Sequence, residues 1–414
     1  MRRREVLWIA AAGVATLATR ATSQERQEPQ PGRGLWRDRL GAFAIGRFPE
    51  FGPGLFAFDY ADQRVGPLAV DERNGGWTMA STLNGQGPPL RSIGSRLGRL
   101  LTQERVLEPV PIRRAAFEVQ AGEITIAGEI ASIEGIEPRA TLLMIYGSGG
   151  AVKEAFDPWA FWFLQSGFAV VTTDKRGTGR SGGDWRVSGL EELAADAAAV
   201  ARHAKRTYPR KPLVAWGASQ AGWIMPQLGA VGLIDRIMMH AGSALTPKAQ
   251  IVAAVVAELA AYGFPPEEIE RARHYYSLDV EVSRGARSWN EIQQAYTVAR
   301  NSGAEWILAP PAAADANERI LIRRMADFDP EPYWRANRAP VLAIFGGKDW
   351  VVPAPANLSA LRSMVPPEGA LTTVVLPEAN HLMFRAQTGV TAEYGSLSQV
   401  EPDYFRTMSS WLAA

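Results

Sequence analysis

Runs of consecutive apolar residues alternate with helix-like segments through the middle of the chain. A fully apolar run of this length is typical of a strand buried on both faces of a parallel sheet. The predicted strands lie at residues 141–146, 168–173, 213–216 and 236–240, and the predicted helices between them at 156–164 and 190–204. Strand–helix alternation predicts an α/β fold in which helices flank a mostly parallel sheet.

The alternation stops after residue 244 and resumes near residue 336. The segment between these points contains four predicted helices, at residues 249–262, 266–276, 289–301 and 314–326. Beyond it we expect strands at 341–345 and 371–376 and helices at 357–364 and 401–411. We therefore divide the core into residues 111–244 and 336–414, with a helical lid at 245–335. Ligands of such sheets bind outside the carboxyl ends of the strands, where a lid would lie.

The segment before residue 111 has a different pattern. Residues 55–58 and 65–70 read as short strands and residues 74–76 as a turn. We predict a small, β-rich module over residues 36–110. Two longer strand patterns, 112–119 and 123–130, flank the turn residues 120–122 and predict an antiparallel hairpin at the start of the core.

The first 23 residues resemble an export signal. Three arginines at positions 2–4 precede an apolar stretch at 6–19, and small residues follow at 21–23. The stretch is shorter than the ~20 residues a transmembrane helix needs. The paired arginines resemble a twin-arginine signal, with Val6 where Phe is more usual. We expect a periplasmic or secreted protein with no stable membrane anchor after cleavage, the alternative being an uncleaved anchor, and a flexible lead-in at residues 24–35.

Composition excludes several kinds of chemistry. The 414 residues include no cysteine, which rules out disulfides, thiolate metal sites and a cysteine nucleophile. A formal net charge of +1 gives no reason to expect nucleic-acid binding. The four histidines, His203, His240, His274 and His381, are scattered, and no carboxylate cluster has metal-ligand spacing. We expect no metal and no cofactor, and the pattern does not indicate an oligomeric state.

Two segments match the pattern Gly-x-Ser-x-Gly/Ala, in which a serine nucleophile occupies a sharp turn between a strand and a helix. Ser181 lies in the more literal match, but Gly-Gly-Asp follows it and cannot open a helix. Ser219 follows the strand at 213–216 and precedes a helical segment. We therefore predict that Ser219 is the nucleophile, the alternative being an ordinary N-cap serine. The Gly-x-Gly-x-x-Gly match at 177–182 lies too far from the next helix to hold a nucleotide.

A serine nucleophile needs a histidine base and a carboxylate that orients it. In this kind of sheet both follow the serine, on loops after later strands. Asp349 lies just beyond the strand at 341–345, and His381 lies on the loop after the strand at 371–376. We predict Asp349 as the acid and His381 as the base. Glu378 is the alternative acid and His240 the alternative base.

The negatively charged oxygen of the reaction intermediate needs two backbone N–H donors. One is predicted to be Gln220, the residue after the nucleophile. The other should come from the loop after the first parallel strand, with Ser148 preferred and Gly149 next. Tyr146, at the start of this second loop, is a candidate pocket residue. Trp185 and Trp223 flank the motif loops and are candidates too, the alternative being that they belong to the core.

Taken together, these motifs resemble the α/β-hydrolase fold. More narrowly, they resemble bacterial serine hydrolases related to prolyl oligopeptidase and dienelactone hydrolase. The resemblance covers roughly residues 111–414 and rests on the segments 146–150, 174–183, 216–223, 345–349 and 379–381. Two residues depart from the family pattern. Tyr146 stands where histidine is frequent, which would change the wall of the substrate pocket, and Ala221 replaces a glycine.

The resemblance implies an acylated serine but fixes no substrate. The leading prediction is an exported hydrolase that cleaves a small carboxylic ester through Ser219. The alternatives are a small prolyl-type exopeptidase acting on short peptides, which would need a charged anchor for a peptide terminus, and a thioesterase. A binding protein that kept the fold and lost the chemistry is disfavoured, because serine, acid and histidine are all present.

Overall fold

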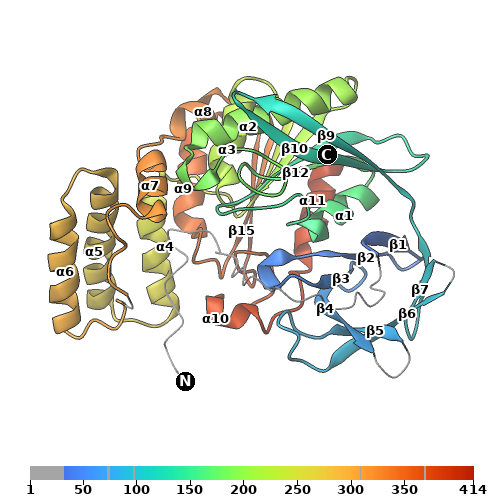
Figure 1. Cartoon of the computed structure of the whole chain (residues 1–414), viewed down its shortest axis with the longest axis horizontal. Helices are drawn as coiled ribbons and strands as arrows, with labels where there is room; N and C mark the ends of the chain where they lie inside the picture. The colour runs from blue at the N-terminus through green and yellow to red at the C-terminus, as the bar shows by residue number, and fades with distance from the viewer. Residues whose placement is uncertain (1–31, 72–74, 97, 308, 368–369) are drawn as a thin grey trace.

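The structure is a computed structural model that describes residues 32–71, 75–96, 98–307, 309–367 and 370–414. The predicted export signal and most of the lead-in after it lie outside these residues. The described chain forms a β-barrel, a large sheet covered by helices, and a group of helices beside that sheet (Figure 1).

The N-terminal part is a closed barrel of eight strands, in which each strand pairs with the next and β1 pairs with β8. Its strands are β1 (Gly34–Arg37), β2 (Ala42–Arg47), β3 (Leu55–Asp59), β4 (Arg64–Asp71), β5 (Gly76–Ala80), β6 (Pro89–Arg96), β7 (Arg99–Leu101) and β8 (Val106–Pro109). Side chains such as Phe43, Met79 and Leu107 fill its interior. The barrel occupies the stretch where the sequence predicts a β-rich module, although the apolar pattern predicts only β3 and β4.

The core is an eight-stranded sheet in the order β16-β15-β14-β13-β11-β12-β10-β9. The strands from β11 to β16 run parallel, and the hairpin β9–β10 adds to one edge in antiparallel fashion. The bounds are β9 (Ile112–Ala121), β10 (Ile124–Ile133), β11 (Ala140–Ile145), β12 (Phe168–Thr173), β13 (Leu213–Ala218), β14 (Arg236–His240), β15 (Val341–Gly346) and β16 (Leu371–Leu376). The predicted mostly parallel sheet is confirmed.

Helices cover both faces of this sheet, and each face has its own apolar cluster. One face packs against α1 (Asp157–Gln165) and α11 (Asp403–Ala413) and also against barrel strands β2 and β3. The other packs against α2 (Leu190–Thr207), α3 (Ala221–Ala230), α8 (Glu331–Ala336) and α9 (Ala354–Met364).

The predicted lid consists of α4 (Pro247–Ala261), α5 (Pro266–Arg284), α6 (Trp289–Asn301) and α7 (Asn317–Met325). These helices stand together at one side of the molecule (Figure 1), and α4 to α6 share a small apolar cluster of their own around Trp306. The main differences from the sequence prediction are that α5 continues to Arg284 and that α8 is additional. The short elements η1 (Pro49–Phe51), η2 (Trp185–Val187) and α10 (Thr391–Tyr394) lie in loops.

The barrel is fastened to the core through α1. Phe48, at the end of β2, contacts Trp159 of α1 and Phe384 through its ring. The fully buried carboxylate of Asp157 in α1 accepts hydrogen bonds from the Arg33 Nε atom at 2.6 Å and from the Arg47 backbone N–H at 2.7 Å. The barrel and the core sheet with its helices therefore share one packed interface.

Replacing Asp157 by alanine should lower the free energy of unfolding by about 2 kcal/mol. The change removes the acceptor of the Arg47 N–H and leaves the Arg33 guanidinium with only a longer contact, 3.8 Å, to Glu129. Breaking a fully buried ion pair costs about 3–5 kcal/mol. The smaller value is expected because the Arg33 side chain is 20% exposed. Urea unfolding measures the difference. Asp315→Ala, at an exposed site, should stay within about 0.5 kcal/mol of wild type, and an equally small change for Asp157→Ala would show that this contact contributes no stability.

Candidate active site

Ser219 occupies a strained turn between β13 and α3. Its φ of 54° lies in the left-handed region that a residue other than glycine seldom adopts. Two tight contacts enforce the turn: a Cβ atom at Gly217 would lie 2.5 Å from the Ala221 Cβ, and one at Gly222 would lie 2.3 Å from the Ser243 carbonyl oxygen. Small residues at these positions let strand and helix approach each other, and the turn holds Ser219 at the carboxyl end of the sheet.

Asp349 and His381 come together from the loops after β15 and β16. The His381 Nδ1 atom lies 2.9 Å from Asp349 Oδ2, and the Asp349 side chain is fully buried. The other carboxylate oxygen, Oδ1, accepts a hydrogen bond from the Val352 backbone N–H at 2.9 Å. Asp349 is therefore held at both oxygens and fixes the orientation of the His381 ring.

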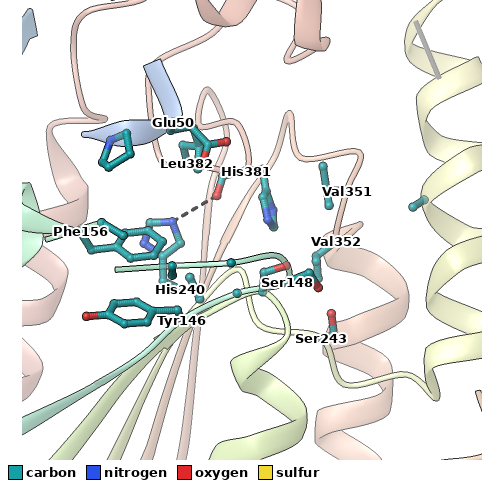
Figure 2. A pocket seen from close by; sticks show the side chains of 18 of the residues that line it. Glu50, Tyr146, Ser148, Phe156, His240, Ser243, Val351, Val352, His381 and Leu382 are labelled. Carbon is teal, nitrogen blue, oxygen red and sulfur yellow. Dashed lines mark hydrogen bonds between the residues drawn. The ribbon is translucent and has the colours of Figure 1, made fainter. Parts of the chain in front are cut away.

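Ser219 and His381 line the same cavity, of about 560 Å³, at the carboxyl ends of the parallel strands. Figure 2 shows His381, Ser148 and Val352 gathered at this end of the sheet. Most of the wall is apolar and is contributed by the barrel loop, the core loops and the lid. Its apolar lining includes Phe48, Phe51, Phe156, Ile251, Ala254, Leu321, Met325, Trp350 and Leu382.

The loop after β11 lies against the turn that holds Ser219. A Cβ atom at Gly147 would be 3.3 Å from the Ser219 Cβ. Ser148 lines the cavity, whereas Gly149, the second choice for this donor, is buried and not among the lining residues. Within the described part of the chain, the backbone N–H groups of Ser148 and Gln220 have no hydrogen-bond acceptor. Both are free to bind an anionic oxygen beside Ser219.

Opposing effects set the charge state of His381. Burial lowers its pKa, but the carboxylate of Asp349 and the more distant one of Glu50 raise it, so that the net pKa is above the usual 6.5. Glu50 belongs to η1 of the barrel and lines the cavity. Burial raises the pKa of the Glu50 carboxyl to about 7, against the attraction of His381.

These pKa shifts predict how activity depends on pH. His381 accepts a proton only when neutral, so kcat/KM should rise with pH, with a midpoint above 6.5. Glu50→Gln removes a negative charge that raises the His381 pKa, so the midpoint should move to lower pH. A pH–rate profile of kcat/KM on a neutral substrate measures both. A wild-type midpoint below 6.5, or a shift to higher pH in the variant, would contradict this account.

His240, the alternative base, contacts a tyrosine and a backbone carbonyl rather than a carboxylate. Its Nδ1 atom lies 2.7 Å from the Tyr404 hydroxyl, and its Nε2 atom donates to the His381 carbonyl oxygen at 3.1 Å (Figure 2). Burial, with the nearby His381 charge, lowers its pKa to about 3, so the ring is neutral. Neither of these partners is a carboxylate. His240 supports the backbone of the His381 loop.

The remaining serine, carboxylate and histidine side chains from the sequence motifs lie away from the cavity. The Ser181 hydroxyl is buried, donates to the Asp174 carbonyl oxygen and accepts from the Ala127 N–H. Glu378 is exposed, and Asp349 is the carboxylate that contacts His381. His203 stacks on Phe117, and His274 is exposed on α5. The glycine-rich loop at 177–182 folds back on itself through a hydrogen bond between Gly177 and Gly182.

Two of the three predicted pocket residues line the cavity, namely Tyr146 and Trp223. Trp185 does not line it. A Cβ atom at Gly150 would lie 2.9 Å from the Trp185 Nε1 atom, so the indole packs against that loop. Sequence reasoning missed Glu50 and the aromatic residues beside it, because nothing in a short barrel loop indicates that it reaches the active site.

Among the described residues, every helix is too short or too polar to span a lipid bilayer. No group of three or more His, Asp or Glu side chains within them is arranged to hold a metal ion.

The strand order, the lid after β14 and the order serine, acid, histidine define the α/β-hydrolase fold. The family described as "Serine aminopeptidase, S33" matches residues 136–270, about a third of the chain. The chain thus has the α/β-hydrolase fold, and residues 136–270 are similar to that family. The narrower resemblance to prolyl oligopeptidase and dienelactone hydrolase stays a prediction.

Three solved structures are weakly similar to this chain. An esterase of Pyrococcus furiosus is 14% identical, with a TM-score of 0.43 over 66% of this chain and 84% of its own. An esterase of Exiguobacterium antarcticum is 15% identical, with a TM-score of 0.44 over 72% of this chain and 100% of its own. The ferulic-acid-bound Est1E of Butyrivibrio proteoclasticus is 13% identical, with a TM-score of 0.45 over 72% of this chain and 100% of its own. No curated protein matches the sequence. Similarities this weak carry no argument about the substrate.

Proposed function

We propose that this protein is a serine hydrolase that cleaves small carboxylic esters through an acyl-enzyme on Ser219. The observation that carries the proposal is that a serine in a left-handed turn and a histidine bonded to a buried aspartate open into one cavity. Ester cleavage by such a set requires no cofactor.

The reaction would proceed in two halves. The Ser219 Oγ atom attacks the ester carbonyl carbon while its proton passes to the His381 Nε2 atom. The Ser148 and Gln220 N–H groups bind the oxygen that becomes negative. As the intermediate collapses, the carbon–oxygen bond to the alcohol breaks, and His381 gives the alcohol its proton. Water then attacks the acyl group by the same route, releasing the acid and restoring Ser219.

The cavity favours a mainly apolar acyl or alcohol group of modest size. Its volume of about 560 Å³ and its mainly apolar wall fit a small molecule rather than a folded protein. Lid helices α4 and α7 form part of this wall through Ile251 and Met325, so the lid should influence chain-length preference.

One observation favours the second candidate, a small exopeptidase. Glu50 is the only acidic residue among the described lining residues, and no lysine or arginine lines the cavity. A carboxylate in this position can pair with a free amino group, the kind of charged anchor that an exopeptidase needs. The same pairing would favour an ester that carries an amine.

Activity on two substrates distinguishes an esterase from an exopeptidase. We would compare kcat/KM on a short p-nitrophenyl ester with kcat/KM on proline p-nitroanilide, using Ser219→Ala as the blank. High ester turnover without anilide cleavage supports the esterase, whereas efficient anilide cleavage supports the exopeptidase. If Ser219→Ala matches wild type on both, the proposed nucleophile is wrong.

The role of Glu50 makes a separate prediction. With p-nitrophenyl esters of matched length, wild type should prefer an amine-bearing acyl chain to one that ends in a carboxylate. Glu50→Gln should reduce this preference roughly 10- to 100-fold, because a hydrogen bond to a charged group contributes about 1.5–3 kcal/mol. An unchanged preference in Glu50→Gln would show that this carboxyl does not select substrate charge.

We further propose that the protein is exported. The basic and apolar pattern of residues 1–23 supports this. Expression with the native N-terminus, followed by cell fractionation and N-terminal sequencing, tests it: an intact, cytoplasmic chain would contradict export.

A further inference from the structure

A half-buried lysine lies behind the site, and the proposed reaction does not use it. Lys175 follows β12, within the segment 174–183 that the sequence analysis singled out. Its Nζ atom donates to the Gly147 carbonyl oxygen at 2.7 Å and to the Gln220 side-chain Oε1 atom at 2.9 Å. Both acceptors belong to the two loops that present the oxyanion donors.

The bond to Gly147 has a direct geometric consequence. The Gly147 carbonyl and the Ser148 N–H belong to one peptide unit, and in a planar trans peptide these two groups point in opposite directions. Holding the carbonyl oxygen toward Lys175 therefore turns the Ser148 N–H away from Lys175. Ser148 lines the cavity and its N–H is free of acceptors within the described chain.

The second bond acts on the other donor. Gln220 is almost fully buried, and its backbone N–H is the donor next to Ser219. Its side-chain Nε2 atom contacts the Met325 sulfur at 3.4 Å, so the amide is held between Lys175 and lid helix α7. The Lys175 side chain thus links the loop of Gly147 to the turn of Gln220, and the backbone N–H groups of both segments must point at the reacting oxygen.

We propose that Lys175 is a positioning residue that fixes the Ser148 and Gln220 N–H groups in the geometry of the oxyanion hole. The proposal rests on the proposed function, because it assigns a role within that reaction. Burial lowers the pKa of Lys175 to about 7. An amine and an ammonium group both have enough protons for two bonds, so this role does not depend on the charge of Lys175.

The test compares transition-state binding with ground-state binding in Lys175→Met. Removing one oxyanion donor outright costs about 10²–10³ in kcat, so a loss of about 10- to 100-fold is expected when both donors stay but lose their support. A trifluoromethyl ketone adds to the serine as an oxyanion, and its inhibition constant should rise by the same factor. KM should change less than about threefold, because the substrate carbonyl is uncharged before attack.

Three further variants complete the design. Lys175→Arg keeps N–H donors for both acceptors and should recover most of the loss. Lys211→Met, at a lysine paired with Glu137 on the surface, should match wild type. If Lys175→Met does not fold, Gln220→Leu decides: it removes only one of the two bonds and should lower kcat and ketone affinity together, by about three- to tenfold.

The outcomes separate this inference from the proposed function. If wild type is active and Ser219→Ala is not, but folded Lys175→Met keeps kcat and ketone affinity within threefold, the positioning role is wrong and the function stands. A large rise in KM with unchanged ketone affinity also overturns it. If wild type neither cleaves esters nor binds the ketone, the proposed function itself fails.

Discussion

Replacing Ser219 by alanine should lower kcat by at least about 10⁴-fold, because removing the nucleophile of a serine–histidine–aspartate set leaves only the contribution of binding and the oxyanion hole. The protein should still fold. Alanine has almost the same volume, and removing the hydroxyl leaves the packing of Gly217 against Ala221 unchanged. Ester turnover and thermal melting measure the two effects.

Ser181→Ala is the matched control, since Ser181 lies in the other Gly-x-Ser-x-Gly segment. It loses two buried hydrogen bonds, to Asp174 and from Ala127, and should melt at a lower temperature. Its kcat should stay within about threefold of wild type, because it does not line the cavity. If activity is lost in Ser181→Ala and kept in Ser219→Ala, the nucleophile is Ser181 and the proposed assignment to Ser219 is wrong.

Asp349→Asn should lower kcat by about 10⁴-fold, because an amide favours the wrong tautomer of the histidine. The hydrogen bonds around Asp349 determine which way the asparagine amide would point. The Val352 N–H donates to one side-chain oxygen of Asp349, so an asparagine would place its carbonyl oxygen there and its NH₂ group toward His381. The His381 Nδ1 atom would then accept a hydrogen bond, and the Nε2 atom would carry the proton and could not act as a base.

The control for this substitution is Glu378→Gln, which removes the other carboxylate near His381 in the sequence. Glu378 is exposed and should be replaceable with little change in kcat. Steady-state kinetics on the same ester measures both variants. If Asp349→Asn keeps more than a tenth of wild-type kcat, Asp349 does not orient the base.

The parts of this molecule that sequence reasoning predicts are those with a local signal. Strands such as β13 and β15 are continuous apolar runs, and burial on both faces of a parallel sheet is what requires that pattern. The positions of Ser219, Asp349 and His381 follow from the same logic, since each comes directly after a predicted strand. The structure brings Asp349 and His381 into contact and places Ser219 and His381 on one cavity.

The parts that could not be predicted depend on contacts between distant segments. Most barrel strands are short and lack clear alternation, so β1, β2 and β5 to β8 have no sequence signal of their own. Glu50 enters the cavity only because the barrel docks on α1 through Phe48 and Asp157. Trp185 flanks the motif loops in sequence but packs against the back of one of them, and the pattern does not tell which way a loop side chain points.

Ser219 is proposed as the nucleophile that His381 activates. The most direct test of this role is to treat the protein with a fluorophosphonate, which reacts with activated serines, and to locate the adduct by peptide mass spectrometry. We expect one adduct per chain, on the peptide that contains Ser219, and strongly reduced labelling in Asp349→Asn. An adduct on Ser181 or Ser148, or labelling that is as fast in Asp349→Asn as in wild type, would contradict this role.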